Sequence, residues 1–215
     1  MTQQTRDLLV RDPSLWLLIA SNAITIYLAL TQGWNLGTLM WVYWIQSVII
    51  GVFHFIRILR LEKFSIEGVK VNGKEIPVTS SEVLVKGFFA TFFAIHYGIF
   101  HFVYLVFLIV GVFTPVFGSG APEWREVGFA SLIFFGNHLF SFFFNQSRDS
   151  HEQNIGAVMM YPYGRILPMH ITIIIGAFVN ALPLFLILKA VADAVTHVLE
   201  HALLRKGRNT APVLR

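Results

Sequence analysis

Residues 166–204, ILPMHITIIIGAFVNALPLFLILKAVADAVTHVLEHALL, form the apolar stretch that decides the fold of this chain. A single helix over this stretch would be about 58 Å long, roughly twice the hydrocarbon thickness of a bilayer. Asn180 and Pro183 interrupt it, and proline breaks a helix interior. We therefore expect two membrane spans here, at about 164–179 and 183–204, with one long helix as the alternative.

The composition of the rest of the chain agrees with a membrane protein. Of its 215 residues, 55% are hydrophobic and only 13% are charged, and the mean hydropathy is +0.65. An ordinary globular domain is about 25% charged. These values predict an all-α fold, a polytopic transmembrane helix bundle that forms one integral membrane domain over residues 1–215. The chain has no Cys, which excludes thiolate metal sites and Fe–S clusters.

Four further spans and one hairpin complete the predicted organisation. The sequence VKVNGKEI alternates around Asn72-Gly73, which predicts a short cytoplasmic hairpin-like loop around 64–78. A disordered connection is the alternative at this place. The apolar segments predict the remaining spans at about 13–31, 36–59, 82–113 and 127–145.

The distribution of basic residues favours six spans over five and sets the orientation. With six spans and a cytoplasmic N-terminus, every Lys and Arg except Arg125 and Lys189 lies on the cytoplasmic side. With five spans, the four basic residues after position 204 would lie outside, against the positive-inside rule. We expect a multi-pass protein of a prokaryotic cytoplasmic (inner) membrane with both termini in the cytoplasm. The basic residues flank apolar spans and form no patch for nucleic acid.

A polar stripe in the last predicted span is the first candidate site. Lys189, Asp193, His197 and His201 recur every four residues, so a helix places them on one face. Ionisable groups inside a membrane are costly and are functional candidates by default. Asp193 and His197 can ligate a metal or relay protons. In the simpler interpretation Lys189 neutralises Asp193, and His201 lies in the headgroup region.

The third predicted span adds two histidines, His96 and His101. They are about 140° apart around a helix, so they cannot chelate one metal together. His96, near the middle of the span, is the better ligand candidate, whereas His101 shares a face with Tyr97 and Tyr104. A histidine bonded to a backbone carbonyl in the core is the alternative for either.

Other spans bring polar groups to mid-bilayer or its cytoplasmic half, and these define a predicted cavity open to the cytoplasm. Convergence on one depth favours a cavity over scattered interfacial residues. His138 lies on a stripe that can serve as interhelical hydrogen-bond glue, and Arg165 can pair with lipid phosphate. The predicted second-shell or cavity residues are Gln46, His54, His101, His138, Arg165, His170 and His201.

Four motifs carry a resemblance to a known family: WVYWIQS at 41–47, HYGIF at 96–100, PYGRILPMH at 162–170 and the D-x3-H of Asp193 and His197. Together they resemble a family of prokaryotic multi-pass membrane proteins known only as a domain of unknown function. The family's second-span motif reads YW-x-E-N, and this chain has Gln46 and Ser47 there. The resemblance implies the fold and the motif positions, and it implies no activity.

The sequence is compatible with three functions and with a fourth interpretation that involves no chemistry. The first is a metal-dependent hydrolase with His96, Asp193 and His197 as ligands of a divalent, zinc-like metal, acting on a lipid-like ester or amide. The second is proton- or ion-coupled transport or relay through the same groups. The third, less favoured, is a haem b protein with axial ligands from His96, His138 and His197. The fourth is a structural membrane subunit.

The predicted partners follow from the composition. Membrane lipids are expected partners, nucleic acid is not, and a homo-oligomer stays open.

Overall fold

The computed structural model describes residues 13–66, 70–71, 74–75, 81–113, 121–149, 153–164 and 190–191. The predicted fifth and sixth spans, 164–179 and 183–204, therefore lie almost wholly outside the described residues. The same holds for Arg165, His170 and the ionisable residues of the last predicted span.

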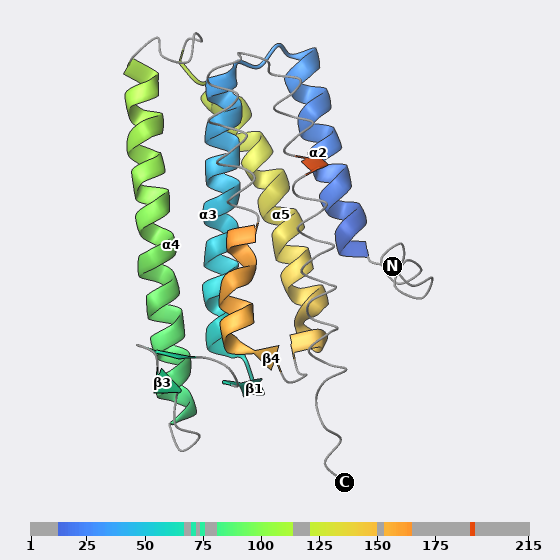
Figure 1. Cartoon of the computed structure of the whole chain (residues 1–215). Coiled ribbons are helices and arrows are strands. Elements are labelled where there is room, and N and C mark those ends of the chain that lie inside the picture. The colour runs from blue at the N-terminus through green and yellow to red at the C-terminus, as the bar shows by residue number, and fades with distance from the viewer. Residues whose placement is uncertain are drawn as a thin grey trace.

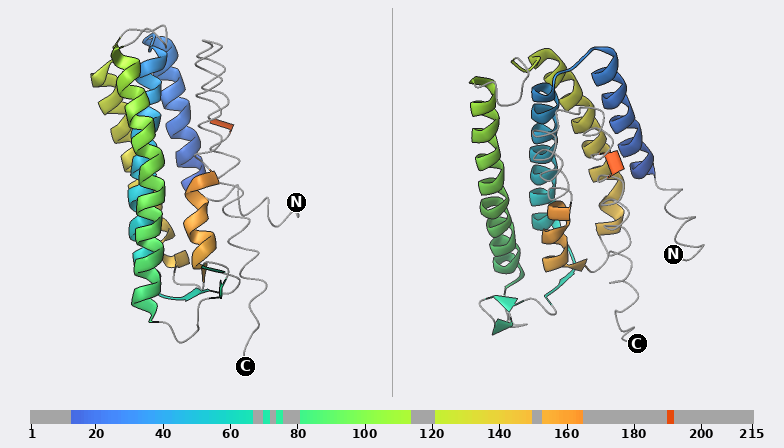
Figure 2. Two further views of the ribbon diagram at one scale, coloured as in Figure 1. Left: turned by 60° about the vertical axis from the view of Figure 1, so that its left-hand side comes forward. Right: turned by 45° about the horizontal axis from the view of Figure 1, so that its top comes forward.

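Helices make up most of the described chain, and they stand side by side with nearly parallel axes (Figures 1 and 2). Three were predicted almost to the residue. The helices are α2 (Pro13–Thr31), α3 (Leu36–Arg60), α4 (Glu82–Phe113) and α5 (Trp124–Asp149). The fourth predicted span, 127–145, is longer in the structure because the polar sequence after it continues the helix.

Three described helices are long and apolar enough to cross a membrane. Their candidate spans are Leu36–Arg60, Glu82–Val110 and Trp124–Phe144, with mean hydropathies of 1.7, 2.1 and 1.6. The apolar part of α2, Trp16–Thr31, is shorter. The described residues thus establish a helical architecture with three candidate spans, and the predicted count of six depends on segments outside them.

The connection from α2 to α3 is a tight turn with caps on both helices. Gly33 has a φ of 67°, a conformation that favours glycine after a helix end. The Trp34 amide then donates to the Ala29 carbonyl at 2.9 Å. Asn35 begins α3, because its side-chain oxygen accepts from the Thr38 amide at 2.7 Å. The turn reverses the chain direction between α2 and α3, and α2 then packs against α5.

In the described part of the chain, four short strands lie at the opposite end of the bundle. β2 (Lys70–Val71) pairs antiparallel with β3 (Lys74–Glu75) in the register Lys70↔Glu75 and Val71↔Lys74. This pairing confirms that the strands of the predicted hairpin pair, while residues 72–73 themselves lie outside the described residues. A second pairing was not predicted, because parallel β1 (Phe64–Ser65) and β4 (Gln153–Asn154) are far apart in sequence.

Helical residues 155–164, hereafter the 155–164 helix, follow β4 and enter the bundle. Ile155 and Val158 are fully buried in one cluster with Ile58 of α3 and Phe93 of α4. The chain thus re-enters the bundle before position 164, where the fifth span was predicted to begin. The β1–β4 pairing and this apolar packing hold the 155–164 helix beside α3 and α4 (Figure 1).

Gly51 permits a close approach of the Tyr97 ring of α4 to the backbone of α3. A Cβ atom on Gly51 would lie 2.5 Å from Tyr97 Cε1, far inside contact distance. We expect Gly51→Ala to lower the free energy of unfolding by about 1–3 kcal/mol, because the helices must move apart. Thermal unfolding in one detergent measures this change.

Gly98→Ala is the matched control on α4. Among the described residues, a Cβ there meets nothing within 4 Å, so the change is expected to be neutral or slightly stabilising. A Gly51→Ala protein as stable as the Gly98→Ala protein would show that this approach does not limit the packing.

Candidate functional site

Ser47, Tyr97 and His101 form a hydrogen-bonded group between α3 and α4, which we call the α3–α4 clamp. The Tyr97 hydroxyl donates to the main-chain oxygen of Ser47 at 2.7 Å. His101 Nε2 lies 2.8 Å from Ser47 Oγ, and His101 Nδ1 lies 2.9 Å from the main-chain oxygen of Tyr97. All three residues are buried. Their hydrogen bonds therefore tie the two helices together where water is excluded.

The hydrogen bonds of the clamp fix the tautomer of His101. A carbonyl oxygen can only accept, so Nδ1 carries the hydrogen and donates to Tyr97. Nε2 is then the acceptor, and the Ser47 hydroxyl donates to it. The imidazole also stacks on the Tyr97 ring, with centroids 4.1 Å apart and planes at 16°. Both ring nitrogens of His101 are thus used within the clamp.

His54 connects α3 to the 155–164 helix. Its Nε2 donates to the main-chain oxygen of Val158, and its ring lies 5.6 Å from that of Phe93. Like His101, this buried histidine bonds to a backbone carbonyl. The structure therefore gives both residues positions in which they hold helices together.

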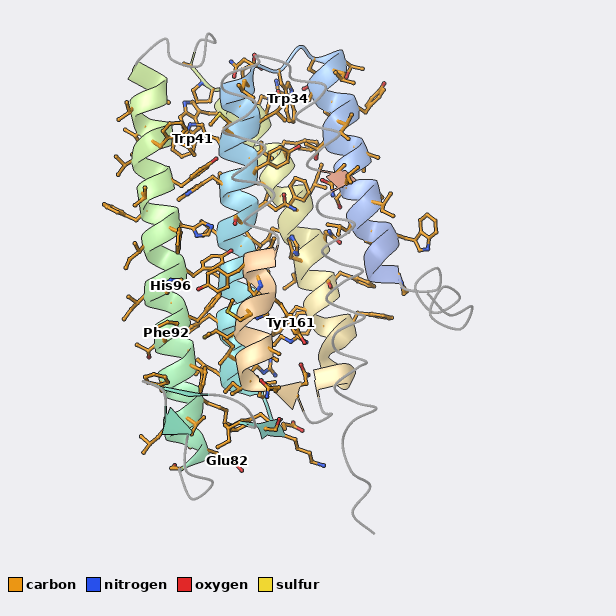
Figure 3. All side chains as sticks on the ribbon, in the orientation of Figure 1. Trp34, Trp41, Glu82, Phe92, His96 and Tyr161 are labelled. Atoms are coloured by element: carbon orange, nitrogen blue, oxygen red, sulfur yellow. The ribbon has the colours of Figure 1, made fainter. Side chains whose placement is uncertain are left out.

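His96 differs from these two histidines, because its side chain is exposed. Its Nδ1 lies 2.8 Å from the hydroxyl of Tyr163 in the 155–164 helix. Phe92 stacks on the imidazole at 5.5 Å, and Phe100 meets it edge-on at 5.1 Å. Figure 3 shows His96 about halfway along α4. The clamp also sets the direction of the His96 side chain. Tyr97 faces α3, and successive helical residues are about 100° apart, so His96 points away from α3.

The depth of His96 can be estimated along the helices. Lys86 donates to the Leu61 carbonyl at 2.9 Å near the strand end of the bundle. His96 lies about 15 Å farther along α4 at 1.5 Å per residue. Toward the opposite end, Trp41 contacts both Trp44 and Trp124, as interfacial aromatic residues do. His96 therefore lies well inside the apolar part of α4.

The other predicted site residues are only partly described. Gln46 is buried on α3, and His138 is half-buried on α5. Within the described residues, no group of three or more His, Asp or Glu side chains could hold a metal ion. Of the three predicted ligands, only His96 is described. The predicted residues outside the described ones are Arg165, His170, Asp193, His197 and His201.

Ser47 and Tyr163 are site residues that the sequence did not indicate. Each lies in a motif that carried the family resemblance, YWIQS for Ser47 and PYGRI for Tyr163. Their partners are on other helices, 54 positions away for Ser47 and His101 and 67 for His96 and Tyr163. Spacing within one helix could not reveal such pairs.

The described residues define a helical bundle with three candidate membrane spans and a buried histidine, tyrosine and serine network. The chain belongs to a family of unknown function (DUF6498), whose family model matches residues 5–210. This confirms the resemblance to a family without an assigned activity. No curated protein and no solved structure matches the chain.

Ser47→Ala tests the clamp. The change removes the donor to His101 Nε2 and leaves a buried acceptor without its hydrogen bond. We expect a loss of stability on the order of 1 kcal/mol, measured by unfolding in detergent.

Ser131→Ala on α5 is the matched control, because Ser131 Oγ is buried and has no hydrogen-bond partner in the described part of the chain. Its removal should be neutral or stabilising. Equal losses in the two variants would contradict the clamp.

Proposed function

We propose that this chain is an integral protein of the cytoplasmic membrane with an intramembrane divalent-metal site. His96 is one ligand, and Asp193 and His197 are the other two. The observation that carries this proposal is the environment of His96. Its side chain is exposed in the apolar part of α4, and one ring nitrogen is hydrogen-bonded to the Tyr163 hydroxyl.

The His96–Tyr163 hydrogen bond suits a metal ligand. Histidines that bind metals usually donate their other ring N–H to an oxygen, which fixes the tautomer and orients the ring. With Nδ1 donating to Tyr163, Nε2 of His96 carries the lone pair that a metal requires. His101 lacks this property, because both of its nitrogens are used in the clamp. The donor set of two imidazoles and one carboxylate suits zinc, iron or manganese.

The chemistry that such a site supports is hydrolysis. A metal with three protein ligands and one open position lowers the pKa of bound water toward neutrality and creates a nucleophile. At the depth of His96 the available substrates are bilayer components, so an ester or amide of a lipid is the proposed substrate.

The clamp favours a positioning role over a relay through His101. Its hydrogen bonds end on the main-chain oxygens of Ser47 and Tyr97, which do not release protons. Relay or transport through other residues, and a structural role, are therefore outcomes of the tests below.

Metal analysis of detergent-purified variants tests the proposal. We expect stoichiometric divalent metal in the unaltered protein and its loss in His96→Ala, Asp193→Ala and His197→Ala. His101→Gln is the control, since it weakens the clamp but should keep the metal. A folded, colourless and metal-free protein would contradict the proposal, as would full metal in His96→Ala. A Soret absorbance band would indicate haem instead.

Tyr163→Phe tests the supporting hydrogen bond separately. The phenyl ring keeps the shape of the side chain and removes the oxygen that orients His96. We expect metal affinity to fall about 10–100-fold in a chelator competition, with the fold unchanged. Unchanged affinity would show that His96 binds metal without this support, or not at all.

A further inference from the structure

The side of α4 around His96 is an apolar surface that the described helices leave open. Phe92, Ile95, Ile99 and Phe100 are 46%, 60%, 58% and 46% exposed. Among the described elements, α4 packs mainly against α3, through the face that carries Tyr97 and His101. On a helix that crosses a membrane, the opposite side meets lipid acyl chains.

Within this surface, His96 and Tyr163 form a polar pair whose hydrogen-bonding capacity the described residues do not exhaust. One hydrogen bond joins the imidazole to the hydroxyl. If Nδ1 donates, the hydroxyl keeps its hydrogen and Nε2 keeps its lone pair. In the other tautomer the roles exchange, and the pair again offers one donor and one acceptor. Bilayer hydrocarbon has no water to satisfy such groups, so a partner with the complementary pattern is favoured.

The described charges of α3 and α4 favour a neutral partner. Lys86 of α4 and Arg57 of α3 are both engaged at the strand end of the bundle. Lys86 bonds to Leu61 and lies over the Phe64 ring, and Arg57 donates to Gln153. A phosphate would remain at that end, whereas the ester or amide linkage of a lipid lies deeper.

We propose that this surface binds a neutral acyl lipid that enters sideways from the bilayer. The ester or amide carbonyl of the lipid accepts a hydrogen bond from the Tyr163 hydroxyl, which leaves Nε2 of His96 for the proposed metal. The acyl chain lies against Phe92 and Phe100. This inference names the substrate class for the proposed metal site and rests on that proposed function, although lipid binding itself requires no metal.

Photolabelling in vesicles tests the lipid site. The full chain, stripped of metal with a chelator, is placed in phosphatidylcholine vesicles with a diacylglycerol that carries a diazirine in one acyl chain. Peptide mass spectrometry then maps the adducts. We expect more adducts at residues 92–100 of α4 than on the exposed apolar face of α5 around Phe140 and Phe143. Unlabelled diacylglycerol should compete, whereas a hydrocarbon of equal chain length should not.

Tyr163→Phe should reduce the α4 labelling about five-fold, the factor expected for one hydrogen bond of about 1 kcal/mol. Phe143→Leu is the control variant and should leave it unchanged. Equal labelling of α4 and α5, or labelling that Tyr163→Phe does not alter, would identify annular lipid only and overturn the inference. The labelling experiment uses metal-free protein, so its result is independent of the metal analysis. If labelling is localised at α4 but the purified protein contains no metal, only the metal site is refuted. Bound metal with uniform labelling refutes the lipid site alone.

Discussion

Pairing of polar groups without water is the constraint on which this structure depends. Ser47, Tyr97 and His101 are buried between two helices that are long and apolar enough to cross a membrane. In hydrocarbon an unpaired polar group costs several kcal/mol, so these side chains must find each other. Their mutual hydrogen bonds fix the rotation of α4 against α3. The direction of every other side chain on α4, including His96, follows from that rotation.

Two further features place a partner beside His96. Gly51 has no side chain, which lets the Tyr97 ring lie against α3 and reach the Ser47 carbonyl. The hydrogen bond from His54 to Val158 and the β1–β4 pairing hold the 155–164 helix against the same pair of helices. Tyr163 thereby comes within hydrogen-bond distance of His96. Among the described histidines, His54 and His101 thus anchor helices, whereas the side chain of His96 remains exposed.

Local patterns in the sequence were sufficient for much of the fold. Apolar segments predicted the helix ends and Asn72-Gly73 predicted the strand pairing around it, because these features depend on neighbouring residues. The β1–β4 pairing and the Ser47–His101 contact depend on residues distant in sequence, and no spacing rule predicts them. His96 was the preferred ligand candidate for its depth alone. What separates it from His101 is the helix rotation, which only the assembled bundle shows.

Nitrogen-15 NMR of the histidine rings in metal-free protein tests the central claim most directly, because it reports the protonation and ligation of each ring nitrogen. The Nε2 resonance of His96 is assigned by its absence from the spectrum of His96→Gln. On titration with Zn²⁺ we expect this resonance to shift. The resonances of His54 and His101 should stay in place, with His101 protonated at Nδ1. A zinc-dependent shift at His101, or none at His96, would contradict the division between anchoring and accessible histidines.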